Sequence, residues 1–155
     1  MKKKILVFTL IFFANILFAQ LPQSREATII EQVSSSEIML EATGIYKGTG
    51  KKAKNRRKDV DSKGLSGAIL DAKKAAVYFL LYNGTDPLLR SPEEQRLFDA
   101  HVAFFFGGEN VNTYITFEEQ SLRKRVKMND GQGLKVAKRF KVNVDRLRKD
   151  LEARN

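Results

Sequence analysis

Apolar and polar side chains alternate along residues 37–48. Ile38, Leu40 and Ala42 fall on one face of an extended chain, and mostly polar residues fall on the other. A period of two residues predicts a β-strand with one buried face. Gly44 lies within this segment and has no side chain to pack. It therefore predicts either a β-bulge or the close approach of another backbone.

A helical period replaces the alternation between residues 65 and 82. The apolar positions that recur at this spacing are Leu65, Ile69, Ala72, Ala76, Phe79 and Leu80. Several of the buried-face residues are alanines, whose small side chains allow a helix to lie close to a sheet. Asn83 and Gly84 supply the residues that commonly end a helix.

A second helix is expected over residues 92–106. Ser91 precedes Pro92, and Glu94 follows three positions after the serine. This is the pattern of a capping box with proline in the first helical turn. Gly107 and Gly108 mark its end.

The last part of the chain predicts a hairpin and a short helix. Residues 111–128 and 134–144 are typical of strands, and turn-forming residues at 129–133 join them. The apolar positions of the first strand change from odd to even numbers, which predicts a bulge or bend at residues 118–121. Residues 145–153 carry a helical apolar stripe.

These elements predict one α+β domain over residues 37–155. We expect a mainly antiparallel, three-stranded sheet with helices packed on one face, in the order strand, helix, helix, strand, strand, helix. Residues 20–36 are mostly polar and indicate a leader or linker with a short helix at 26–33. Residues 48–64 are hydrophilic and indicate a loop.

The amino-terminal residues have the layout of a secretory signal peptide. Three lysines at positions 2–4 precede an apolar stretch that ends near the small residue Ala19. Cleavage before Gln20 is the predicted outcome, which gives an exported protein of the periplasm or the periphery of the outer membrane. The apolar stretch is shorter than the roughly 20 residues of a spanning helix, so a retained anchor is the less favoured alternative.

Composition narrows the chemistry further. The chain has no cysteine, which excludes disulfides, thiolate nucleophiles and lipid attachment through cysteine. Its net charge is +10, and removal of the signal peptide with its three lysines leaves +7. A basic protein attracts nucleic acid, anionic lipid or acidic glycan, and export makes nucleic acid the least favoured of these. No cofactor or metal site is predicted, because His101 is the only histidine.

Acid–base chemistry has only weak candidates. Glu93 and Glu94 are adjacent, as are Glu118 and Glu119. Neighbouring side chains point apart on a strand and diverge on a helix, whereas paired catalysis needs two carboxylates that face each other. A hydrolase that uses these acids or His101 is therefore the least favoured function.

Two groups of cations are the candidate binding residues. The first belongs to the predicted hairpin and comprises Arg123, Arg125, Lys127, Lys135, Arg139 and Lys141. The second belongs to the predicted loop and comprises Lys51, Lys52, Lys54, Arg56, Arg57 and Lys58. Alternation is expected to place the hairpin group on one side of two paired strands, where it would meet anionic glycan or lipid head groups. The simpler interpretation is that these charges keep an exposed face soluble and discourage edge pairing.

Short motifs give the chain a resemblance to a known family. Ala42-Thr43-Gly44 in the first strand, the segment 71–76 (DAKKAA) in the helix, and Val142-Asn143-Val144 followed by 147–151 (LRKDL) carry it. Together they resemble the amino-terminal domain of flagellar assembly protein T and related outer-membrane surface lipoproteins. They also resemble uncharacterised exported envelope proteins that begin with the same order of strand, glycine and helix. The resemblance implies a small α+β module of envelope assemblies without catalytic residues, often followed by further domains.

The sequence thus predicts an exported, non-enzymatic assembly or interaction module with a protein partner in the cell envelope. The first alternative is a module that binds anionic glycan or lipid through the basic hairpin face. The sequence defines neither the partner nor an oligomeric state.

Overall fold

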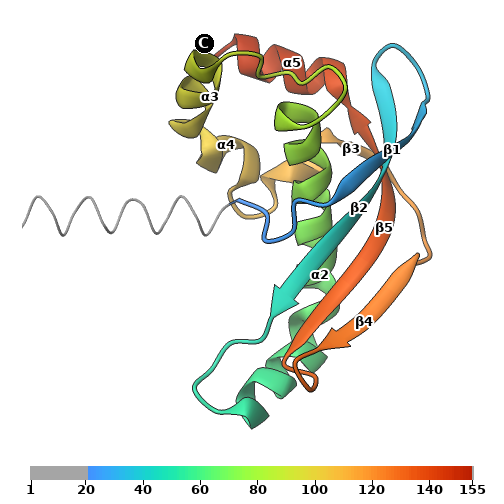
Figure 1. Cartoon of the computed structure of the whole chain (residues 1–155), viewed down its shortest axis with the longest axis vertical. Helices are drawn as coiled ribbons and strands as arrows, with labels where there is room; N and C mark the ends of the chain where they lie inside the picture. The colour runs from blue at the N-terminus through green and yellow to red at the C-terminus, as the bar shows by residue number, and fades with distance from the viewer. Residues whose placement is uncertain (1–20, 155) are drawn as a thin grey trace, which may run out of the picture.

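The computed structural model describes residues 21–154, which form an α+β domain with an antiparallel sheet (Figure 1). The predicted signal peptide (1–19) and Gln20 lie outside the described residues. The elements in chain order are β1 Ala27–Gln32, β2 Glu37–Lys47, α2 Ala53–Tyr82, α3 Pro92–Asp99, α4 Val102–Phe106, the 3₁₀ helix η1 Asn110–Tyr114, β3 Ile115–Glu118, β4 Lys124–Met128, β5 Gly133–Asn143 and α5 Val144–Glu152.

The sheet has five strands rather than the three expected, and the order of the elements differs accordingly. Its path is β1-β2-β5-β3, and β4 also pairs with β5. Strands β3 and β4 lie one after the other along the same edge of β5. The β2–β5 pairing is unbroken from Glu37↔Asn143 to Lys47↔Gly133. Helix α2 crosses one face of this sheet, and the opposite face is the open face (Figure 1).

The prediction of a linker over residues 20–36 is wrong for the residues that the structure describes, 21–36. Residues 27–32 form the edge strand β1 instead of a short helix, and Pro22 and Ser24 ahead of it are buried. The cause is a tertiary contact of Asp71 in α2. Its carboxylate accepts hydrogen bonds from the backbone N–H groups of Gln23 (2.7 Å), Ser24 (3.1 Å) and Ile45 (2.8 Å).

The expected loop at 48–64 is also wrong, because α2 begins at Ala53 and continues for 30 residues. Side chains from its first turns bind the distant β4–β5 turn, which stabilises a helical start that the local sequence disfavours. Arg56 donates from Nε to the Gln132 side chain (2.6 Å), and Arg57 donates from Nε to the Asp130 carbonyl (2.8 Å).

The close helix–sheet approach predicted from small residues is confirmed. A Cβ added to Gly44 would lie 1.8 Å from the carbonyl oxygen of Ala68 and 2.4 Å from the amide nitrogen of Ala72. Both alanines are fully buried. Gly44 therefore marks a backbone contact between β2 and α2, as a glycine inside a strand often does.

The remaining elements confirm most of the sequence pattern. The capping box at Ser91 and Glu94 is present, but the helix breaks at Ala100 and His101 into α3 and α4. The hairpin turn has left-handed φ at Asn129, Asp130 and Gly131, as its composition predicts. The predicted bend in the outgoing segment is an interruption between β3 and β4, and η1 precedes it.

Among the helices of residues 21–154, none combines the length and hydropathy that a membrane crossing requires.

Candidate functional site: the open face and the basic end

The pairing register divides the predicted hairpin cations between the two faces of the sheet. Arg125 lies opposite Val136 and Lys127 opposite Leu134. Residues that lie opposite each other in an antiparallel pair project from the same face, and both partners are buried toward α2. Lys135, Arg139 and Lys141 occupy the alternate positions of β5 and project from the open face. The prediction that the hairpin cations share one face is therefore wrong. The observed register differs by one position from the register that would place the cations of both strands on the same side.

Each of these three open-face cations has a partner. Lys135 pairs with Glu26 at 2.9 Å, and Arg139 pairs with Glu41 at 3.1 Å. Lys141 lies over the ring of Phe117 at 5.5 Å from its centroid. The hydrogen bond from Lys135 lowers the pKa of Glu26, against a smaller opposing effect of burial. Carboxylates thus neutralise Lys135 and Arg139, whereas Lys141 is held against an aromatic ring and keeps its charge.

Exposed apolar side chains accompany these pairs. Ile30, Phe117 and Val126 are 43%, 45% and 40% exposed, respectively. Phe117 and Val126 lie opposite Lys141 and Lys135, which places them on the open face. Ile30 is the extra residue at a bulge of β1, between Ile29↔Leu40 and Glu31↔Met39. The open face is therefore a mixed surface of apolar groups and fixed ion pairs.

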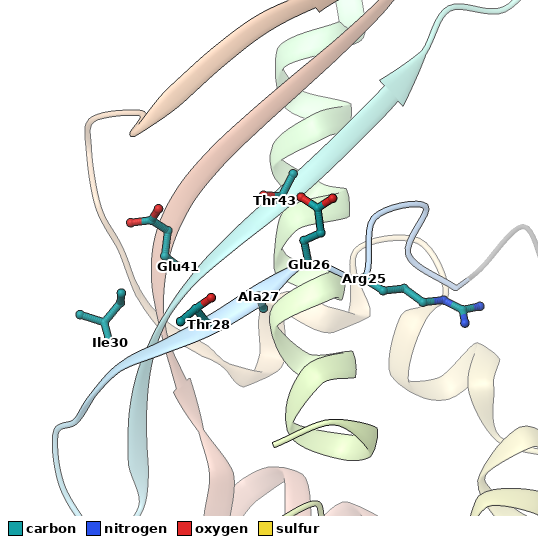
Figure 2. A pocket seen from close by; sticks show the side chains of 7 residues that line it. All are labelled: Arg25, Glu26, Ala27, Thr28, Ile30, Glu41 and Thr43. Carbon is teal, nitrogen blue, oxygen red and sulfur yellow. The ribbon is translucent and has the colours of Figure 1, made fainter. Parts of the chain in front are cut away.

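A shallow depression lies on this face over β1 and β2 (Figure 2). Thr28, Ile30, Glu41 and Thr43 project into it, and Figure 2 shows Arg25 turned away from them. The guanidinium of Arg25 lies over the ring of Tyr78, 5.0 Å from its centroid. The lining of the depression mixes hydroxyl, carboxylate and aliphatic groups. Its two carboxylates, Glu26 and Glu41, form ion pairs with the open-face cations Lys135 and Arg139.

The second group of cations forms what we call the basic end, residues 47–63 and 125–132. The start of α2 and the β4–β5 turn meet there, at the lower end of the long axis in Figure 1. The two arginines at the helix start are fixed, because Arg56 also donates from Nη1 to the carbonyls of Gly50 and Lys51. Lys51, Lys52, Lys54 and Lys58 are exposed and make no ion pair with another described residue.

An aspartate secures the chain just before this helix. Asp59 accepts hydrogen bonds from the Thr49 backbone (2.8 Å), the Thr49 hydroxyl (2.9 Å) and the Tyr46 hydroxyl (2.8 Å). These hydrogen bonds lower the pKa of Asp59 to about 2, and the bond from the Thr49 backbone has the largest effect. Asp59 is thus a structural anion that holds the loop between β2 and α2.

Two further ionisable sites lie where α2 meets the sheet: a cluster of Lys138, Glu118 and Lys73, and the carboxyl of Asp71. Lys138 is 6% exposed and pairs with Glu118, which also pairs with Lys73 of α2 at 2.8 Å. Burial raises the pKa of Glu118, but the two lysine hydrogen bonds outweigh it, so the net pKa is lowered. At Asp71, burial outweighs the three backbone hydrogen bonds, and the pKa of this carboxyl is raised.

The weak acid–base candidates take structural positions. Glu94 closes the capping box by accepting from the Ser91 backbone at 2.9 Å, and Glu119 pairs with Arg123. His101 is half-buried where α3 gives way to α4. Among residues 21–154, no three His, Asp or Glu side chains gather as a metal site would require.

Comparison with family models, with curated proteins and with solved structures returned no match. Sequence reasoning missed β1 and the Asp71 contact that positions it. The β-branched run Thr28-Ile29-Ile30 was the available signal for a strand. The contact itself has no local signal, since it joins residues more than forty positions apart.

Proposed function

We propose that this protein is an exported assembly module of the cell envelope, without catalytic activity, that holds a protein partner on the open face of its sheet. The observation that carries the proposal is the composition of that face. Ile30, Phe117 and Val126 are each about two-fifths exposed beside ion pairs that are already formed.

Such a surface suits a protein partner better than a small ligand. Protein interfaces combine apolar contacts with hydrogen-bonding groups. The apolar share of the area of such an interface is about the same as that of the rest of the protein surface. Side chains that are held in ion pairs before binding lose less conformational entropy when a partner arrives. The depression over β1 and β2 is shallow, whereas small-molecule sites are usually concave and enclosed.

The cellular location in this proposal rests on the sequence. The signal-peptide pattern of residues 1–19 supports export, and the resemblance to flagellar assembly protein T and the outer-membrane lipoproteins supports a role in envelope assemblies. Three of the four carboxylates considered for hydrolysis, Glu94, Glu118 and Glu119, are engaged in a helix cap or in ion pairs, which favours an interaction module over an enzyme.

The test is cross-linking in intact cells followed by quantitative capture from envelopes. Val126→Asp and Ile30→Asp place a charge on the open face, and Leu97→Asp is the matched control. Leu97 lies in α3 and is 37% exposed, so it differs from the other two chiefly in location.

We expect a defined partner to be lost from both open-face variants and kept by the control, with all three folded by circular dichroism. Equal capture by all three variants would refute the proposal. Cross-links solely between copies of this chain would show that the open face binds a second copy instead of a different protein, and this result would also refute the proposal.

A further inference from the structure

The net charge of the described chain is confined to the basic end. Residues 47–63 and 125–132 contain ten Lys or Arg and three Asp or Glu. The remaining described residues contain fifteen of each sign, so the basic end holds the entire excess of +7. A charge concentrated at one extremity creates a local potential that a uniform distribution of the same charges would not.

Lysines and arginines have different roles at this end. Arg56 and Arg57 hold the helix to the β4–β5 turn through hydrogen bonds to Gln132 and Asp130. Lys51, Lys52, Lys54 and Lys58 project into solvent without a described ion-pair partner. Lysine ammonium groups are mobile point charges, which suit a diffuse anionic surface better than the bidentate recognition of one anion.

The placement of these cations at the amino-terminal end of α2 lowers the stability of the helix. Lys52 occupies the cap of a 30-residue helix, and its first two turns carry four more cations, Lys54, Arg56, Arg57 and Lys58. The helix has no acidic residue in its first turn and no side-chain cap. The helix dipole makes this end positive, so cations there are destabilising. The dipole also adds to the potential that the lysines present to solvent.

We propose that the basic end binds the surface of a membrane that contains anionic phospholipids. Each lysine or arginine near such a surface contributes attraction that falls off within a Debye length. The basic end lies at an extremity of the long axis (Figure 1), so it reaches a flat surface without covering the open face. It carries no aromatic residue, whereas proteins that bind single-stranded nucleic acid usually stack bases on aromatic rings.

The experiment measures co-sedimentation of the exported, purified protein with lipid vesicles. The vesicles contain phosphatidylcholine alone or with about 30% phosphatidylglycerol, at about 50 and 500 mM salt. One variant replaces Lys51, Lys52, Lys54 and Lys58 by Gln. The matched control replaces Arg96, Arg146, Arg148 and Lys149 by Gln, which removes the same charge from exposed positions of α3 and α5.

We expect binding to the anionic vesicles alone, with loss at high salt. The four-lysine variant should bind several hundredfold more weakly, since each lysine contributes about fivefold, and the control should remain within about fivefold of the original protein. The urea midpoint of the four-lysine variant should not fall, because removing cations from the positive end of a helix does not destabilise it.

Equal weakening of both variants would show that net charge alone matters and would overturn the proposal. Equal binding to neutral vesicles would overturn it in favour of apolar adsorption. A DNA duplex or heparin bound as tightly as the anionic vesicles would overturn it in favour of general polyanion binding. None of these results bears on partner capture by the open face, so the two proposals fail independently.

Discussion

Substitution of Gly44 by Ala tests the contact that holds α2 to the sheet. The new Cβ would lie 1.8 Å from the Ala68 carbonyl oxygen and 2.4 Å from the Ala72 amide nitrogen. Both are backbone atoms inside a helix and have no rotamer with which to yield. The helix must therefore withdraw by roughly 1.5 Å to restore ordinary contact distances of about 3.5 Å.

The cost follows from what such a shift separates. Ala68, Ala72 and Ala76 are fully buried between α2 and the sheet, and a gap of 0.5–1 Å already loses roughly a quarter to a half of each contact's dispersion energy. Overpacking in a core costs about 1–3 kcal/mol when side chains can adjust. Because backbone must move here, we expect a loss of about 3 kcal/mol or more in the free energy of unfolding.

Urea denaturation followed by circular dichroism measures this loss. With a slope of about 2 kcal/mol/M, the midpoint should fall by about 1.5 M. Gly84→Ala is the control, because its Cβ would meet no atom closer than 3.8 Å. A loss below about 1 kcal/mol for Gly44→Ala, with the native circular dichroism spectrum retained, would refute the proposed helix–strand contact.

Three further predictions concern single side chains. Asp71→Ala removes the acceptor of three backbone N–H groups and should cost about 3 kcal/mol in urea denaturation, whereas an unchanged midpoint would contradict the role of this carboxylate. Hydrogen bonds lower the folded-state pKa of Asp59 to about 2, from an ordinary value of 3.8. Its stabilisation is therefore present above about pH 4 and is lost as the pH falls toward 2. Asp59→Asn should therefore flatten the dependence of the urea midpoint on pH in that window, and an unchanged slope would exclude Asp59 as its source. Ser91→Ala breaks the capping box and should lower the free energy of unfolding by about 1 kcal/mol, while the conservative Ser91→Thr should retain most of the cap.

The sequence by itself determined the elements whose signals are local. Alternation defined β2 and β5, the Ser91–Glu94 spacing defined the start of α3, and the turn residues at 129–131 defined the hairpin. In each case the side chains that specify the structure lie within a few residues of one another.

The tertiary structure alone decided the features that depend on distant partners. Asp71 recruits the segment at residues 23–24 and makes β1 possible, and the hydrogen bonds of Arg56 and Arg57 extend α2 through a segment that reads locally as a loop. The strand register then distributes the hairpin cations over two faces, because a side-chain period of two makes their placement depend on an offset of one residue. Composition fixed the excess of positive charge, but folding gathered it at one end by bringing residues 47–63 beside 125–132.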